Sequence, residues 1–346
     1  GALDALSSLI IEKFHRFPAV LLVLIMLIIM FPGMITGSST AAVLSAGSIM
    51  APVLALMGID AVTSGSIIAM GALLGMIAPP VNTAALIICA GIDVPYVGFE
   101  GPLALITFPL AILFVLLLGY KQARHMDYEK LKPALEKQDA IRKQYGVRIY
   151  IPLLVLVALM VIFKVLKLGE DIGMPLMFLI SAAVGLFTGK KINVLTAVPE
   201  AIRTAAPVMG ILMGVGMFIE VMTATGVRGL VVISCLRLPS TLWLLACAIS
   251  IPLFGAVSSY GACSVLGVPF AYIYASLLGG NSVVVLAAIS LIAAVGDMMP
   301  PTALAGLFAA QVTGVEKYTE ILKRCIVPII ILLVYACFFL ANSKLI

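Results

Sequence analysis

The stretch GALLGMIAPP at residues 71–80 recurs as IAAVGDMMPP at residues 292–301, with an offset of 221 positions (71 to 292). Proline removes a backbone donor and clashes with the preceding helical turn, so a helix that reaches either Pro-Pro pair must open there. We infer a duplication in which each copy contains one broken helix. The same offset aligns further residues of the two copies without a gap: Arg16 with Arg237, Pro18 with Pro239, Ser38 with Ser259, Ala41 with Ala262, and Gly58 with Gly279.

The composition indicates a membrane protein. Of the 346 residues, 63% are hydrophobic and 11% are charged, whereas a soluble domain carries about 25% charged residues. Apolar runs recur from Pro18 to Leu340, with the length that a hydrocarbon core of ~30 Å requires of a helix. The runs lack the period-two alternation of barrel strands. The sequence therefore predicts an all-α polytopic membrane protein in contact with the lipid bilayer.

Composition also argues against other classes. The six cysteines lie singly, without a CxxC pair or a histidine partner, which is typical of core-filling residues rather than metal ligands. The net charge of +5 forms no compact basic stripe with aromatic residues, so no nucleic-acid partner is indicated.

Each copy opens with a pair of short apolar runs separated by a polar, Gly-rich tip. The runs are about 15 residues long and reach roughly 22 Å as helices, which is less than the bilayer core requires. This pattern predicts a re-entrant helical hairpin in each copy, at 18–57 and 239–278. The tips read GMITGSST at residues 33–40 and GAVSSYG at residues 255–261.

These elements divide the chain into two repeats and a loop. Residues 1–120 form the first repeat, 121–148 a polar loop, and 149–346 the second repeat. In the shared register, a counterpart of residues 149–221 is expected to precede the first repeat. The remaining predicted elements are the broken helices 60–93 and 282–313, the closing helices 103–120 and 322–340, and the scaffold and arm helices 149–237. Among the last, residues 193–205 are predicted to form a helix too polar to span the membrane, followed by an apolar spanning helix at 207–225.

Basic residues predict the orientation of the two repeats. They concentrate in the loop 121–148, at Lys190 and Lys191, and between Lys317 and Arg324. The positive-inside rule makes all three regions cytoplasmic. Counting crossings from the loop, the first hairpin enters from the cytoplasm and the second from outside. The copies are therefore predicted to be inverted repeats.

Inverted repeats with paired discontinuous helices are the plan of secondary transporters. Carbonyl and hydroxyl oxygens at such breaks suit a hard cation such as Na⁺, and open helix N-termini suit an anionic substrate. A single Ser or Thr in a membrane helix also fits a packing role, so the symmetric placement favours binding. The candidate ion- and substrate-binding residues are Gly37, Ser38, Ser39, Gly75, Asn82, Thr83, Ser258, Ser259, Tyr260, Gly296, Asp297 and Thr302. Among them, Ser38, Ser39, Thr83, Ser259 and Thr302 are the candidate Na⁺ ligands.

Asp297 is the charged residue that stands out within the second broken helix. It is surrounded by apolar residues, where the first copy has Met76. An ionisable group at membrane depth is costly and is a functional candidate by default. Two interpretations stay open: Asp297 belongs to an ion or proton pathway, or it faces a water-filled cavity or pairs with a backbone amide.

The residues GSSTAA at 37–42 and GALLGMIAPP at 71–80 resemble the large, DctM-like membrane subunit of tripartite ATP-independent periplasmic (TRAP) transporters, within the ion-transporter superfamily. The resemblance extends over nearly the whole chain. It implies an elevator-type transporter in a bacterial or archaeal cytoplasmic membrane that imports a carboxylate substrate with Na⁺ and needs no other cofactor. It further implies two protein partners, a periplasmic solute-binding protein and a small four-helix membrane subunit.

The same resemblance implies that Ser38 and Ser39 bind an ion together with the break 75–83, and Ser258 and Ser259 together with the break 296–302. Val81 and Met299 depart from the family, which usually has Ser and Thr at these positions.

Other classes of protein fit less well. An intramembrane aspartyl protease would use an embedded Gly-x-Gly-Asp motif, whereas residues 294–297 read AVGD, so no enzyme is expected. A channel or a purely structural membrane protein would not need inverted hairpins. A stand-alone ion-coupled anion carrier of the same superfamily remains an alternative. Because no Arg stands in either tip, the sequence does not identify the substrate.

The predicted orientation can be tested by cysteine labelling of intact cells. We expect Val97→Cys to react with an impermeant maleimide from outside, and Glu129→Cys to react only after the cells are opened. The reason is that the positive-inside rule places residue 129, within the basic loop 121–148, on the cytoplasmic side together with the two other basic regions. Labelling of the residue 129 variant from outside would contradict the inverted arrangement.

Overall fold

The computed structural model describes residues 9, 12–14, 16–124, 144–165, 174–188, 191, 193–256, 262–301 and 303–345. Every regular element in these ranges is helical, which confirms the predicted all-α class. Within them, four helical segments are long and apolar enough to cross a membrane: α2 (Pro18–Thr36), Ser39–Leu56, α7 (Glu100–Ala123) and α18 (Tyr318–Ala341).

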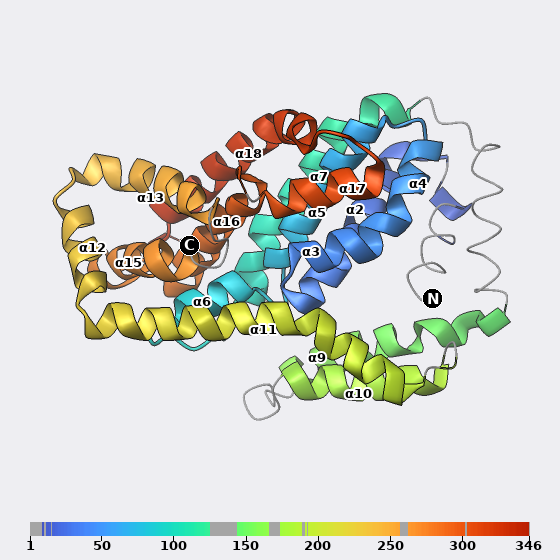
Figure 1. Ribbon diagram of the computed structural model, residues 1–346, viewed down its shortest axis with the longest axis horizontal. Helices are drawn as coiled ribbons and strands as arrows, with labels where there is room; N and C mark the ends of the chain where they lie inside the picture. Colours follow the sequence, from blue (N-terminus) through green and yellow to red (C-terminus); the bar gives the residue numbers. More distant parts are fainter. Residues whose placement is uncertain are drawn as a thin grey trace. The chain divides into compact units, whose positions relative to one another are not determined.

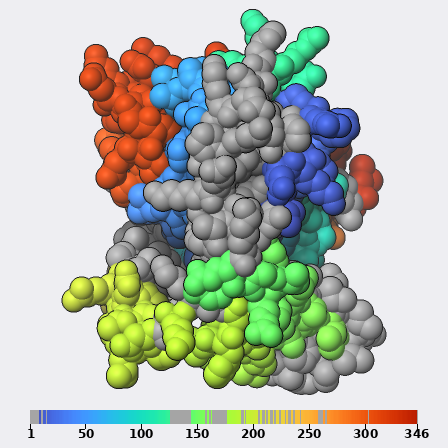
Figure 2. Space-filling view, turned by 90° about the vertical axis from the view of Figure 1, so that its right-hand side faces the viewer, coloured from blue at the N-terminus to red at the C-terminus, as the bar shows by residue number. Residues whose placement is uncertain are grey.

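The chain divides into two compact units, and the smaller one comprises residues 1–17 and 128–206. Its described elements are the 3-10 helix η2 (Gly146–Tyr150), α9 (Ile151–Val165), α10 (Met174–Thr188) and the first part of α11 (Val194–Ala224). Helices α9 and α10 lie side by side, coloured green and yellow-green in Figure 2. The Ser181 hydroxyl donates to the Pro152 carbonyl at 2.8 Å and joins the two helices.

Helix α11 differs from the sequence prediction. The polar residues 193–205 were expected to form an arm helix separate from the apolar helix that follows, whereas the structure has one helix of 31 residues. The change from polar to apolar side chains alters which surroundings suit the helix but does not interrupt its backbone hydrogen bonds. Polarity alone therefore misplaces this boundary.

The larger unit, residues 18–127 and 207–346, contains both predicted hairpins and both broken helices. The first hairpin consists of α2, α3 (Ser39–Ala42), the π-helix η1 (Val43–Gly47) and α4 (Ser48–Leu56). Helix α2 continues through Pro32 to Thr36, four residues beyond the predicted run. It ends at Gly37, which has a φ of +66°, the left-handed conformation that glycine adopts at helix C-termini. The tip is therefore shorter than the sequence suggested. Both arms of this hairpin, α2 and Ser39–Leu56, are long and apolar enough to cross a membrane, so the expectation that these runs are too short to cross is wrong for the first hairpin.

Both predicted helix breaks are present. Helix α5 (Ala61–Ile77) is followed by α6 (Thr83–Gly91), and α16 (Ser282–Ala294) with the 3-10 turn η5 (Val295–Met298) is followed by α17 (Leu304–Thr313). The Pro79-Pro80 and Pro300-Pro301 bonds between the segments are both cis. The first break begins at Ala78 rather than at Gly75, because Gly75 and Ile77 still belong to α5.

The second hairpin is described on either side of its tip. It follows α12 (Val227–Leu236) and begins with α13 (Ser240–Gly255). After residues 257–261, which lie outside the described part, it continues as the π-helix η3 (Cys263–Gly267), α15 (Val268–Ala271) and the π-helix η4 (Tyr272–Leu277). A π-helical segment thus occurs in the second arm of both hairpins.

The first segments of the two broken helices form the core of this unit. All residues of α5 from Thr63 onward, and all of α16 from Val284 onward, are buried, and Figure 1 shows both helices at the centre of the surrounding bundle. Each hairpin packs against the second segment of the other half's broken helix: η1 contacts α17, and η3 contacts α6. The two halves therefore interlock.

Local backbone features recur at the predicted offset of 221. Gly58 and Gly279 both have positive φ, at 82° and 68°. The next matching pair, Asp60 and Asn281, provides the side-chain N-caps of α5 and α16. A cap satisfies an amide that the first helical turn leaves open. Both broken helices thus begin with the same glycine turn and the same kind of cap.

In each half, a close contact between two glycines lets the hairpin pack directly against its own broken helix. A Cβ atom on Gly75 would lie 2.5 Å from the Met30 carbonyl oxygen, and one on Gly33 would lie 2.8 Å from the Gly75 carbonyl carbon. In the second half, a Cβ atom on Gly255 would lie 2.8 Å from the Cα of Gly296. Small residues let membrane helices approach backbone to backbone. The glycines at both breaks therefore serve close packing.

We expect Gly75→Ala to destabilise the protein, because the added methyl group would meet backbone rather than a movable side chain. The cost of such overpacking is on the order of 1–3 kcal/mol. Gly214→Ala is a matched control, since that glycine lies exposed in α11 with open space around it. Thermal unfolding of the purified protein in detergent should show a lower Tm for the first variant only; equal Tm values would argue against the close contact.

Candidate functional site

At the tip of the first hairpin, Gly37 and Ser38 connect α2 to α3, which begins at Ser39. Ser38 caps α3 by accepting the Ala41 amide at 3.3 Å, and its own amide donates to the Thr36 hydroxyl at 3.2 Å. Glycine after a helix and serine before the next are the residues that each of these positions favours. Two residues therefore suffice to reverse the chain.

The first helix break lies directly against this tip. The Val81 amide donates to the Met34 carbonyl at 3.2 Å, and the Thr83 hydroxyl donates to the Gly37 carbonyl at 3.3 Å. A Cβ atom on Gly37 would collide with the Thr83 hydroxyl oxygen, so only glycine permits this approach. The structure thus brings together the predicted residues Gly37, Ser38 and Thr83.

A residue from the second half completes the cluster. The Ser39 hydroxyl donates to Asp297 Oδ2 at 2.5 Å, and the two side chains are 3% and 2% exposed. Hydrogen bonds to a carboxylate are short and about twice as strong as neutral ones. Asp297 therefore contacts the first tip, although sequence reasoning grouped it with the second break.

Asn82 joins the two helices on either side of the first break. Its Oδ1 accepts the Ala85 amide at 2.9 Å, which caps α6. Its Nδ2 donates to the Ile77 carbonyl at 3.1 Å and to the Ser290 hydroxyl at 2.8 Å. Asn82 is completely buried, so this side chain stabilises the break from within.

Tyr96 is a second residue at the break, and sequence reasoning missed it together with Ser290. The Tyr96 hydroxyl accepts the Asn82 amide at 3.2 Å and donates to the Pro80 carbonyl at 3.1 Å. Burial raises the pKa of this phenol above its ordinary value, which keeps its proton available for donation. Tyr96 lies 14 residues beyond Asn82, and no sequence signal connects them.

Other predicted positions have different surroundings. Gly75 lies inside α5, and its carbonyl accepts the Ala78 amide at 3.3 Å. Gly296 lies in η5 against Gly255. Ser258, Ser259, Tyr260 and Thr302 lie outside the described residues.

Asp60 is a charged residue away from the breaks, at the start of α5. Burial raises its pKa, but hydrogen bonds from Thr63 and Gln122 and the charge of Arg324 outweigh this and hold the pKa below its usual value. The Gln122 side chain donates to Asp60 Oδ2 at 2.5 Å, and its oxygen accepts the Asp60 amide at 2.9 Å. Asp60 thereby ties α5 to α7.

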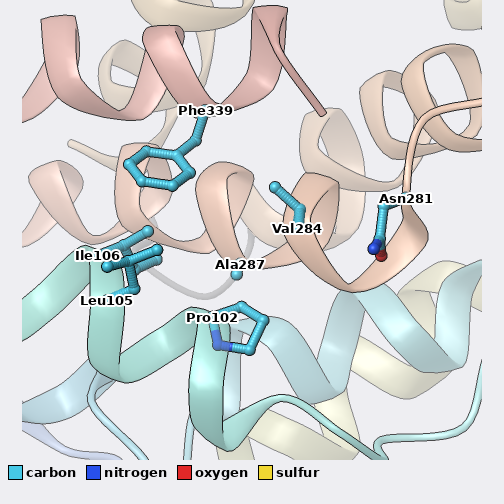
Figure 3. A pocket seen from close by; sticks show the side chains of 7 residues that line it. All are labelled: Pro102, Leu105, Ile106, Asn281, Val284, Ala287 and Phe339. Carbon is cyan, nitrogen blue, oxygen red and sulfur yellow. The ribbon is translucent and has the colours of Figure 1, made fainter. Parts of the chain in front are cut away.

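A cavity of about 250 Å³ lies elsewhere, between α7, α16 and α18 (Figure 3). None of the predicted site residues lines it. Its walls are apolar except for the side chain of Asn281 and would not replace the hydration shell of a cation. The lining residues are Pro102, Leu105, Ile106, Asn281, Val284, Ala287 and Phe339.

Interlocked broken helices and several helices long and apolar enough to cross a membrane are typical of a multi-pass membrane protein. A model of the family described as tripartite ATP-independent periplasmic transporter, DctM component, matches residues 1–343. The chain belongs to this family, which confirms the resemblance seen in its sequence. DctM proteins are transporter components rather than enzymes. A comparison with curated proteins gives no match.

Proposed function

We propose that this chain is the ion-coupled transport subunit of its TRAP system, and that it imports a carboxylate-type solute together with Na⁺. The observation that carries the proposal is the closure of the first tip on the first break, through the bonds of Val81 and Thr83 to the end of α2 and the tip. This closure gathers hydroxyl and carbonyl oxygens in a buried place, and these are the ligands that hard cations prefer.

The first ion site is proposed to use Ser38, Ser39 and Thr83. All three side chains are buried, and each already makes a hydrogen bond at the junction of tip and break. Ser39 and Thr83 donate their protons in these hydrogen bonds, so the lone pairs of their oxygens could coordinate a cation without new positions for the side chains. Ser259 and Thr302 are proposed as the corresponding ligands of a second ion.

Asp297 is proposed to belong to the ion or proton pathway. Its carboxylate lies beside Ser39, where a negative charge would offset part of the cost of placing a cation inside the protein. The proposal thus favours the functional interpretation of this residue.

We also propose that the two halves are inverted repeats that carry out an elevator-type motion, and the matched features of the halves support the duplication that this requires. Both halves share the offset, the Gly58 and Gly279 turns, the caps of α5 and α16, and the glycine contacts at the breaks. We further propose a periplasmic solute-binding protein that delivers the substrate and a small four-helix membrane subunit. A stand-alone carrier is the alternative, and uptake without any binding protein would favour it.

Na⁺ coupling can be tested with the complete transporter in proteoliposomes. We expect uptake of the carboxylate to rise with an inward Na⁺ gradient and to be absent with K⁺ of equal magnitude. Ser38→Val should weaken the apparent Na⁺ affinity, because it removes a candidate ligand and the cap of α3. Ser48→Val is the control, since Ser48 is exposed and bonds only within its own hairpin arm. Uptake that ignores Na⁺ and follows a pH gradient would contradict the proposal.

Asp297→Asn separates the charge of Asp297 from its hydrogen bonding. The amide oxygen can still accept the Ser39 hydroxyl, so we expect normal expression and a Tm close to wild type. Coupled uptake should fall at least tenfold, because the charge near the ion is lost. Ser39→Ala, which keeps the charge and removes the bond, is the complementary variant. Fully coupled uptake by Asp297→Asn would assign the residue a structural role.

A further inference from the structure

Ser290 is a completely buried polar residue near the middle of α16. Its hydroxyl donates to the Ala287 carbonyl of its own helix at 2.8 Å. The same oxygen accepts Asn82 Nδ2 at 2.8 Å. Asn82 belongs to the other half of the chain, 208 residues away. Ser290 therefore links the centre of the second broken helix to the break in the first.

The two hydrogen bonds of Ser290 determine which side of the Asn82 side-chain amide carries Nδ2 and which carries Oδ1. Because the single hydroxyl proton of Ser290 is directed at Ala287, its oxygen acts as an acceptor toward Asn82. This arrangement favours Nδ2 on the side of Ser290. Oδ1 then faces the Ala85 amide, which it accepts at 2.9 Å. One hydroxyl thus selects the orientation in which Asn82 caps α6.

The orientation of Asn82 matters because its amide spans the break. Nδ2 also reaches the carbonyl of Ile77, the last residue of α5, at 3.1 Å. The next residue, Thr83, points its hydroxyl at the Gly37 carbonyl. A change in the Asn82 amide would therefore disturb the contact between tip and break.

We propose that Ser290 is a positioning residue that fixes the geometry of the first helix break from the opposite half of the chain. This rests on the proposed function in one respect, namely that the break forms part of an ion site. Asp297 follows Ser290 by about two helical turns and holds Ser39 of the first tip. The continuous segment α16–η5 is thus hydrogen-bonded to the first site at two points, to Asn82 at the break and to Ser39 at the tip.

The structural part of the proposal is tested by hydrogen exchange without Na⁺ or substrate. In Ser290→Ala, amides in a peptide covering 83–91 should exchange about three to ten times faster than in the wild type, the expected effect of losing one buried hydrogen bond. Asn82→Ala should act similarly, and the double variant should exchange no faster than Asn82→Ala. Ser66→Ala is the matched control, since this serine is also completely buried and its hydroxyl donates to the Val62 carbonyl of its own helix.

The functional part is tested with the complete transporter. Ser290→Ala should weaken the apparent Na⁺ affinity about three- to tenfold, while the substrate KM at saturating Na⁺ stays within about twofold. Ser290→Cys, whose sulfur is a weaker acceptor, should lie between wild type and Ser290→Ala. A merely structural defect would lower the maximal rate and leave the apparent Na⁺ affinity unchanged.

The two measurements distinguish the possible failures. Unchanged exchange at 83–91 in Ser290→Ala, or additive effects with Asn82→Ala, would overturn the positioning role. Faster exchange with an unchanged apparent Na⁺ affinity would overturn the link between the geometry of the first break and ion binding. Uptake independent of Na⁺ would refute the proposed ion, and the exchange result would still decide whether Ser290 positions Asn82.

Discussion

The constraint on which this structure depends is that backbone groups opened inside a membrane must find partners within the protein. The first helix break exposes several such groups. The Ile77 carbonyl accepts Asn82 Nδ2, the Pro80 carbonyl accepts the Tyr96 hydroxyl, and the Val81 amide donates to Met34. Each partner comes from a different segment, so the break can exist only where a hairpin tip, a loop and a helix cap converge.

This requirement explains why the two halves interlock. The glycines of α5 and η5 let each hairpin come close enough to its broken helix for backbone contact, while η1 and η3 reach across to the other half. Hydrogen bonds inside a membrane protein average under about 1 kcal/mol each, so no single bond determines the arrangement. Close packing brings the halves together, and the polar contacts select the register of tip against break.

In the proposed function, the same contacts would let the site couple an ion to transport. Ser39 and Thr83 donate to groups on the facing segments, which holds their oxygens in place, so an ion coordinated by these oxygens would bind well only in the closed arrangement. A ligand shifts a conformational equilibrium by its difference in affinity for the two states. A site assembled from separate segments provides such a difference, whereas a site within one helix would not.

The amino-acid sequence by itself determined the local features of this protein. Apolar runs indicated membrane helices, the Pro-Pro pairs indicated both breaks, and Gly37 with Ser38 indicated the first tip, because each of these signals acts on the backbone within a few residues. The tertiary structure decided what the sequence could not. Helix α2 continues past Pro32 and α11 remains whole, since one missing donor or a change in polarity does not end a helix. Asn82 bonds to Ser290 and Tyr96, and Asp297 accepts a hydrogen bond from Ser39. Nothing in the local pattern predicts these pairings, because the residues meet only when helices more than two hundred residues apart, or a loop and a break, pack against each other.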